Sequence, residues 1–174
     1  MSKRTSLPLA VLMVGAVLAL MCIPASGAGT ASIGFSPATV TVQTGAVFSL
    51  TVVVNDVIDL YGLQLDASYN DEYLEFVNAE AGTMPGSDDV STYFATPAAE
   101  AGEILHGAIT RLSNDAGIDG SGTIVEVFFR ALKDTTGTYV KIENPQLVDR
   151  NGQDISRSYI NSGRCKVIIS ADAT

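Results

Sequence analysis

The stretch LYGLQLDASYNDEYLEF, from Leu60 to Phe76, decides the fold. Apolar and polar residues alternate between Tyr61 and Tyr69, and this period of two is typical of a half-buried strand. One face of the predicted strand carries Leu63, Leu65, Ala67 and Tyr69, and the other carries Gly62, Gln64, Asp66 and Ser68. The stretch contains neither a catalytic nucleophile in a recognisable motif nor a metal-binding cluster.

Comparable runs recur along the chain, separated by residues that favour turns, such as the Gly, Pro, Ser and Asp of AGTMPGSDDVS (81–91). They are ATVTVQTGAVFSLTVVVND (38–56), EILHGAITRL (103–112), TIVEVFFRAL (123–132), TYVKIENPQLV (138–148), QDISRSYI (153–160) and CKVIIS (165–170). Short strands at this spacing predict an all-β sandwich or jelly roll. The segment TPAAEAGE (96–103) has room for one helical turn between Pro97 and Gly102, so no long helix is expected.

The N-terminus has the features of a secretory signal peptide. Lys3 and Arg4 precede an uncharged apolar run from Leu7 to Ile23, and small residues follow Pro24. We therefore expect residues 1–28 to be a cleaved signal peptide and residues 29–174 to form one secreted domain. A transmembrane helix is the competing interpretation of the apolar run. Lipidation at Cys22 is disfavoured because Met21 stands where a lipobox requires a small residue.

The composition limits the possible partners. Without Lys3 and Arg4, the mature chain has eight basic and nineteen acidic residues, a net charge of −11. An acidic surface repels phosphate backbones and anionic lipids, which argues against nucleic acid and against a membrane surface as partners. Cys165 is then the only cysteine of the predicted mature chain, and its alternation with Val167 and Ile169 predicts a buried, unreactive thiol.

Several of these segments together resemble a cohesin domain. They are SPATVTVQTGAVFSLTVVVNDVIDLYGLQLDASYNDEYLEFVNAEAG (36–82), GEILHGAI (102–109), GSGTIVEVFFRALK (120–133), LVDRNGQDI (147–155) and SGRCKVII (162–169). The most specific element is Gly-x-Gln-x-x-x-x-Tyr-Asn from Gly62, followed by Tyr-Leu-Glu and, about fifty residues later, by Gly-x-Gly-Thr opening a strand. The family commonly has Asp-Pro where this chain has Asn70 and Asp71, so a different turn is expected there.

The resemblance implies a nine-stranded β-sandwich of jelly-roll topology that binds a dockerin, a calcium-dependent module on another chain. It also implies that the dockerin lies on the flat outer face of strands eight, three, six and five, and that the complex serves polysaccharide degradation or surface assembly on a scaffold. The calcium in such complexes belongs mainly to the dockerin, so no cofactor or metal is expected on this chain.

Alternation predicts which side chains occupy that outer face. TIVEVFFRAL is taken as strand eight, with Val125, Val127, Phe129 and Ala131 pointing inward. The expected partner-binding residues are Gly62, Gln64, Asp66 and Ser68 on strand three, His106, Ala108, Thr110 and Arg111 on strand six, and Ile124, Glu126, Phe128 and Arg130 on strand eight. Phe128 and Ile124 beside Ala108 would form an exposed apolar patch of the kind that marks partner surfaces, unless a loop covers Phe128 or a bulge turns it inward.

Catalytic and metal-binding alternatives are weaker. A lone histidine such as His106 is more often a surface or contact residue than a ligand or general base. Asn114, Asp115 and Asp119, and also Asp149, Asn151 and Asp154, form oxygen-rich segments, but neither has EF-hand spacing, so turns are favoured over calcium. No nucleophile elbow, His-Glu-x-x-His or phosphate-binding loop is present, and the pair Asp88 and Asp89 is better explained as a solvated loop than as glycosidase carboxylates.

Two other binding functions remain open beside dockerin capture. A carbohydrate-binding module of the same jelly-roll type would use exposed aromatic residues, and this chain has no Trp, although Tyr61, Tyr93 or Phe128 could substitute. A structural part of an adhesin or surface layer is the third possibility. The sequence therefore predicts a secreted, non-catalytic binding module.

Overall fold

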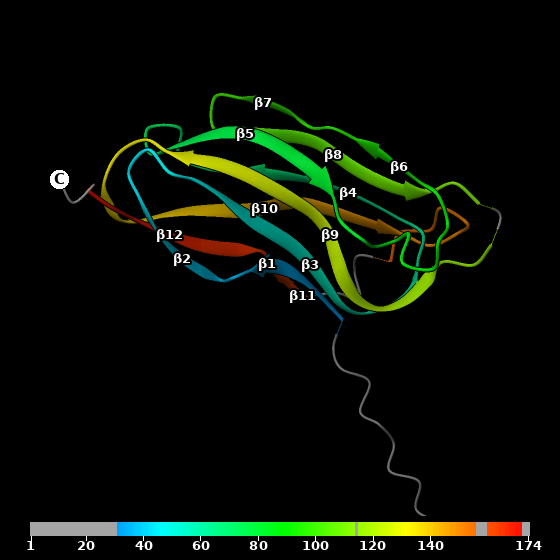
Figure 1. Cartoon of the computed structure of the whole chain (residues 1–174). Helices are drawn as coiled ribbons and strands as arrows, with labels where there is room; N and C mark the ends of the chain where they lie inside the picture. The colour runs from blue at the N-terminus through cyan, green and yellow to red at the C-terminus, as the bar shows by residue number, and fades with distance from the viewer. Residues whose placement is uncertain (1–30, 114, 156–159, 172–174) are drawn as a thin grey trace, which may run out of the picture.

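The computed structural model describes residues 31–113, 115–155 and 160–171, which form two β-sheets packed face to face (Figure 1). The five-stranded sheet has the order β11 (Ile160–Ser162), β1 (Ser32–Ser36), β3 (Val47–Leu60), β9 (Ile118–Ala131) and β5 (Leu74–Ala81). The seven-stranded sheet has the order β2 (Thr39–Gln43), β12 (Arg164–Ser170), β10 (Thr135–Val148), β4 (Gly62–Ser68), β8 (Glu103–Arg111) and β6 (Thr92–Ala95), and β7 (Ala98–Glu100) also pairs with β8. The predicted signal peptide, residues 1–28, lies outside the described residues.

The all-β sandwich predicted from the sequence is confirmed. The described residues contain twelve strand segments. The first two, β1 and β2, are halves of one N-terminal segment that changes sheet at Pro37, and β7 and β11 are three residues each. Counting β1 with β2 and setting β7 and β11 aside leaves nine strands, the number that the family resemblance implies. The segment 96–103 forms β7 rather than a helical turn, because its backbone pairs with β8.

Alternation places the core side chains as predicted. Leu63, Leu65 and Ala67 on β4 are 4–5 % exposed, and Leu50, Val52 and Val54 on β3 are completely buried. Phe129 lies at the centre of an aromatic cluster, with ring centroids 5.3 Å from Tyr69, 6.1 Å from Phe48 and 6.3 Å from Phe76. Burying one face of each long strand against the other sheet supplies most of the hydrophobic stabilisation.

The turn after β4 differs from the family pattern in sequence and is organised by Asn70. Its side-chain oxygen accepts a hydrogen bond from the Glu72 amide at 2.9 Å, and its carbonyl accepts from Tyr73 and Leu74 at 3.1 and 3.0 Å. Asparagine favours such turns because its side chain satisfies a backbone donor two residues further on. The turn therefore carries the chain from β4 in one sheet to β5 in the other without proline.

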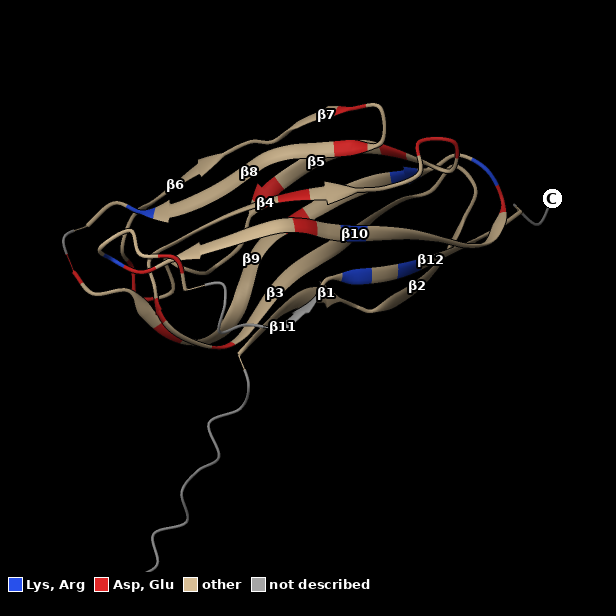
Figure 2. Cartoon of the chain, turned by 180° about the vertical axis from the view of Figure 1, so that it is seen from behind, with Lys and Arg blue, Asp and Glu red and all other residues tan. Residues whose placement is uncertain are grey.

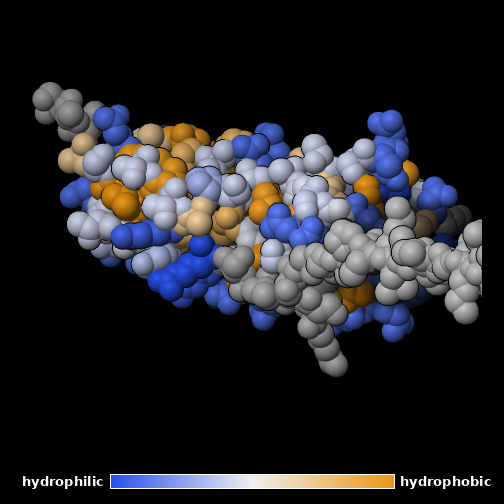
Figure 3. Space-filling model, turned by 90° about the horizontal axis from the view of Figure 1, so that it is seen from below, coloured by the Kyte–Doolittle hydropathy of each residue, from blue (hydrophilic) through white to orange (hydrophobic). Residues whose placement is uncertain are grey.

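The edge of the sandwich that carries β1 and β2 has a mixed surface. Figure 3 looks onto this edge from below, and apolar side chains are interspersed there with polar ones. None of the large apolar side chains that are more than 40 % exposed among the described residues belongs to β1 or β2.

No helix in the described ranges has the length and apolar character needed to cross a membrane.

Cys165 on β12 is fully buried, as the alternation with Val167 and Ile169 predicts. Burial raises the pKa of its thiol to about 11, because the charged thiolate is poorly solvated between the sheets. The thiol is therefore protonated at neutral pH.

We expect a thiol reagent to label Cys165 only after denaturant is added, which absorbance of the released chromophore measures. Replacing Cys165 with Ala should lower the free energy of unfolding by about 1 to 2 kcal/mol, as a small truncation in a core does. Rapid labelling of the native protein would contradict the burial of β12.

Candidate functional site

The outer face of the seven-stranded sheet carries the polar side chains of β4. Gln64 is exposed, and Asp66 and Ser68 are half-buried, whereas the residues between them point into the core. Gly62 is buried rather than exposed, because the side chains of its neighbours close over it. A Cβ atom at Gly62 would lie 3.1 Å from Thr110 Oγ1 and 3.3 Å from Val148 Cγ2.

Two rows of paired residues cross this face from β6 to β10. In the first row Tyr93 pairs with Thr110, and Thr110 and Val148 flank Gly62. In the second row Ala95 pairs with Ala108, and Ala108 and Gln146 flank Gln64. We call this set the outer platform; its members are Tyr93, Ala95, Ala108, Thr110, Gly62, Gln64, Gln146 and Val148.

Tyr93 is the prominent side chain of the outer platform. It is 59 % exposed, while the next residue, Phe94, packs against the core. Leu112, 61 % exposed, follows β8 and donates a backbone hydrogen bond to Ser91 at 2.8 Å, just before β6 begins. An aromatic side chain above small neighbours is the kind of surface that a protein partner can bury.

His106 lies beside the outer platform at a bulge in β8. The pairing with β4 changes register between Leu65 and Ala67, and His106 has a φ of 60°. Its backbone amide donates to Asp66 Oδ1 at 2.9 Å, and its Nδ1 lies 3.8 Å from the same oxygen. The side chain is 76 % exposed, so the interpretation of His106 as a surface residue fits the structure.

This sheet carries acidic residues on β4, β8 and β10 and basic residues on β12, as the red and blue of Figure 2 show. The acidic residues are Asp66 on β4, Glu103 on β8 and Glu143 on β10, and the basic residues include Arg164 and Lys166 on β12 and Lys141 on β10. Glu143 accepts a hydrogen bond from Ser68 at 3.0 Å, and Asn144 donates to Asp66 Oδ2 at 3.4 Å. Within the described part of the chain, no Lys or Arg forms an ion pair with these three carboxylates.

Strand β9 lies in the other sheet, so the predicted position of Ile124, Glu126, Phe128 and Arg130 on this face is wrong. Phe128 pairs with Ser49 and Asn78, and Arg130 forms a 3.1 Å ion pair with Glu75 on β5. The strand next to β4 is β10. Alternation reveals which side of its own sheet a residue faces but does not reveal the sheet to which the strand belongs.

Ile124 is 1 % exposed, and its neighbour Val125 is also buried. Two consecutive buried residues do not fit simple alternation. The ladder between β3 and β9 shifts register here, since Val52 pairs with Val125 and Val53 with Thr123. Such a bulge inserts one residue and reverses the expected side. The predicted apolar patch of Phe128, Ile124 and Ala108 therefore does not exist, and Tyr93 is the exposed aromatic residue next to Ala108.

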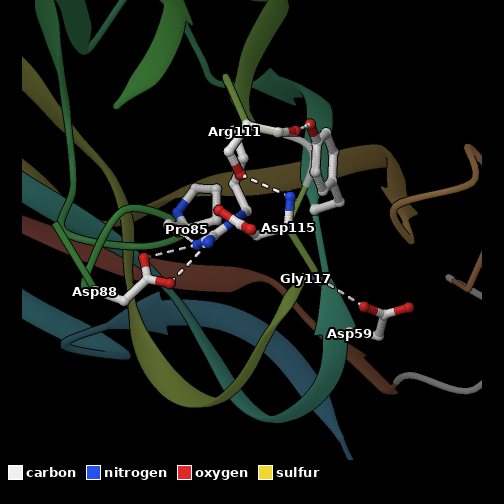
Figure 4. A network of polar contacts seen from close by, with 8 residues as sticks. Asp59, Pro85, Asp88, Arg111, Asp115 and Gly117 are labelled. Carbon is white, nitrogen blue, oxygen red and sulfur yellow. Dashed lines mark hydrogen bonds and ion pairs between the residues drawn. The ribbon is translucent and has the colours of Figure 1, made fainter. Parts of the chain in front are cut away.

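Arg111, predicted on the outer face, points inward and is 3 % exposed. Figure 4 shows its guanidinium group directed at the loop between β5 and β6. Nη1 and Nη2 donate to the two oxygens of Asp88 at 2.8 and 2.7 Å, and Nη1 also donates to the Pro85 carbonyl. The predicted outward position of Arg111 is therefore wrong: strict alternation after Thr110 favours an inward side chain, and the sequence does not reveal its acidic partner.

Four members of the outer platform were not predicted as site residues: Tyr93, Ala95, Gln146 and Val148. Tyr93 lies in a strand of four residues, which is too short for a clear periodic signal. For Gln146 and Val148, the ladder between β4 and β10 shifts register between Glu143 and Gln146, so alternation from Val140 onward does not predict their side reliably.

Of the two acidic segments, the one at Asp149 forms a turn, and Asp119 of the other lies in β9. Asp149 Oδ1 accepts backbone hydrogen bonds from Asn151 and Gln153, both at 2.8 Å. Asp119 Oδ1 accepts from the Asp59 amide at 2.8 Å, and Asn114 lies outside the described residues. No cluster of three possible metal ligands occurs in the described ranges.

The described residues form a two-sheet sandwich with a partly apolar outer face, which is the class of this domain, and comparison with known proteins gives its family. The chain belongs to the cohesin family, because the family model described as the cohesin domain matches residues 33–167. Cohesin domains are non-catalytic protein-binding modules, so the prediction that this chain is not an enzyme is confirmed. A search of curated protein sequences gives no match.

Solved structures with the same fold come from several microorganisms. A non-cellulosomal cohesin from Archaeoglobus fulgidus is 14 % identical, with a TM-score of 0.63 over 81 % of this chain and 91 % of that chain. A type II cohesin–X-dockerin complex from Acetivibrio cellulolyticus matches at 17 % identity and a TM-score of 0.66, over 80 % and 98 % of the two chains. A type I cohesin–dockerin complex from Clostridium thermocellum matches at 12 % and 0.65, over 82 % and 94 %.

The hydrogen bonds from Arg111 lower the pKa of the Asp88 carboxyl. A lowered pKa in the folded state means that the charge of Asp88 stabilises the fold above the ordinary value of 3.8, and that this contribution is lost as the pH falls through the folded-state pKa. We expect Asp88→Asn to unfold at a lower urea concentration than the wild type at about pH 7, with a smaller difference at about pH 2.

Urea unfolding curves at the two pH values measure this difference. Asp89→Asn is the matched control, because Asp89 neighbours Asp88 in the same loop and forms no ion pair in the described structure. A difference between wild type and Asp88→Asn that is equally large at both pH values would contradict the role of the charge.

Proposed function

We propose that this cohesin domain binds a dockerin module on another chain and that the outer platform is the contact surface. The observation that carries the proposal is the outer platform itself, where an exposed Tyr93 stands beside Ala95, Ala108 and Thr110. Family membership supports a protein partner, and similar folds from Acetivibrio cellulolyticus and Clostridium thermocellum occur in complexes with dockerins.

Polar groups border the apolar part of the outer platform. Its members Gln64 and Gln146 offer amide groups, and Asp66 and Ser68 continue the polar surface along β4. Interfaces commonly bury a central aromatic anchor and form hydrogen bonds around it. Gln64, Asp66, Ser68, His106, Ala108 and Thr110 thus remain proposed contact residues, joined by Tyr93, Ala95, Gln146 and Val148. Gly62 contributes by letting Thr110 and Val148 approach each other.

In this proposal the domain is secreted, and the complex attaches a partner protein to a scaffold or surface, in polysaccharide degradation or surface assembly. Calcium belongs to the dockerin, as the family resemblance implies.

The alternative, a carbohydrate-binding function, would need an aromatic platform. In the described structure Tyr93 is the aromatic side chain that is more than 40 % exposed, so it would have to form that platform. Pull-down with calcium-loaded dockerins of the same genome, run beside a polysaccharide-affinity gel, separates the two functions.

Replacing Tyr93 with Ala should weaken dockerin binding about 30-fold or more, since truncating a central anchor costs about 2 kcal/mol. The melting temperature should stay nearly unchanged, because an exposed side chain contributes little to the core. Isothermal titration calorimetry with the captured dockerin measures the affinity, and thermal unfolding checks the fold.

Phe128→Ala is the matched aromatic control on the opposite sheet, and Thr51→Lys tests the same distant face with a charge. Both should leave the affinity unchanged. Persistent binding by Tyr93→Ala, or loss of binding by Phe128→Ala in a folded protein, would move the contact surface away from the outer platform.

A separate prediction concerns secretion and the position of cleavage. The mature protein should begin between Ala28 and Thr30, because the small residues before this point suit signal peptidase. Intact-mass measurement of protein from the culture medium decides this. A retained Met1 in the membrane fraction would show instead that the apolar run anchors the chain.

A further inference from the structure

The loop from Gly82 to Ser91 crosses the open end of the sandwich from the five-stranded to the seven-stranded sheet. Its first half is fixed to β9, because Gly82 donates to the Ile124 carbonyl and Met84 to the Thr123 carbonyl, both at 2.8 Å. The Met84 side chain is 2 % exposed and packs over Gly122. The loop therefore starts from a rigid anchor in one sheet and delivers β6 to the other.

Strand β6 has few contacts of its own to hold it. It contains four residues, from Thr92 to Ala95, and it forms the edge of the sheet with β8 as its partner. Short edge strands open more readily than central ones because fewer hydrogen bonds and apolar contacts restrain them. The position of Tyr93 therefore depends on how the preceding loop is held.

Arg111 restrains both the strand and the loop. Its backbone pairs with Thr92, and its side chain forms the bidentate pair with Asp88 and the hydrogen bond to the Pro85 carbonyl. We call Arg111, Asp88 and the Pro85 carbonyl the Arg111 clamp. Bidentate arginine–carboxylate pairs fix orientation as well as distance.

Asp88 is the carboxylate that hydrogen-bonds to the Arg111 guanidinium group in the described structure, whereas Asp115 acts on it only through a Coulombic interaction. The guanidinium group is 1 % exposed, and its buried Nε atom has no hydrogen-bond partner. Asp88 supplies the hydrogen-bonded negative charge that a buried cation requires, so its removal leaves Arg111 without a bonded counter-charge. The loop would then have to shift to let water reach the guanidinium group.

From this arrangement we propose that the Arg111 clamp is a positioning device that holds β6, and with it Tyr93, ready for the partner. This inference rests on the proposed dockerin binding for its functional half. Binding is tighter when the contact residues are ordered beforehand, because less conformational entropy is lost on association. Arg111, buried and out of reach of any partner, thus acts on affinity through Tyr93.

The structural half is tested on the free protein by hydrogen exchange. In Asp88→Asn, the exchange of the β6 amides should accelerate by a larger factor than that of the β12 amides, which should accelerate only as far as the global stability falls. Arg111→Lys should behave like Asp88→Asn, because lysine lacks the bidentate fork. Asp89→Asn is the control and should match the wild type. Unchanged exchange in β6 overturns the proposal, whether or not any dockerin binds.

The functional half is tested with the calcium-loaded dockerin that the wild type binds in the pull-down. Asp88→Asn should weaken binding about tenfold in the wild-type background and less than about twofold in the Tyr93→Ala background, because the clamp acts through Tyr93. Equal losses in both backgrounds overturn the positioning role. Complete absence of dockerin binding by the wild type counts against the proposed function, and hydrogen exchange then still decides whether the clamp holds β6.

Discussion

The contact between Phe129 and Tyr69 is the constraint on which the rest of the structure depends. Phe129 belongs to β9 of one sheet, and Tyr69 follows β4 of the other, so their edge-to-face contact at 5.3 Å joins the two layers. Phe48 and Phe76 complete the cluster from the two strands that flank β9. Because one face of β4 packs against this core, the side chains on its other face point to the outer surface of the sheet, where the outer platform lies.

Much of this arrangement is legible in the sequence, because strands alternate with a period of two. The stretch from Leu60 to Phe76 predicts the buried face of β4 correctly, and the last strand predicts the burial of Cys165. Gln64 and Ala108 were placed on one face by alternation and are neighbours in the register. Local pattern is sufficient in these cases because burial of one strand face is a property of the strand itself.

What the sequence did not reveal are relationships between strands. Phe128 has the outward side that alternation predicts, but in the other sheet, because hydrogen-bond partners far apart in the chain decide the sheet. Ile124 is buried because the pairing between β3 and β9 contains a bulge. Arg111 pairs with Asp88, which lies in the loop between β5 and β6. Tyr93 was considered only as a substitute aromatic, since a four-residue strand gives too short a pattern to fix its neighbours.

The N-terminal strand β2 pairs in parallel with the C-terminal strand β12 over five residue pairs, from Thr39 and Lys166 to Gln43 and Ser170. Because parallel neighbours run in the same direction, the start of one and the end of the other lie at opposite ends of the sandwich. A force that pulls the start of β2 and the end of β12 apart would therefore load these hydrogen bonds together, in shear, instead of opening them one at a time. The parallel ladder therefore resists a force along the strand direction more than a ladder whose bonds open in sequence.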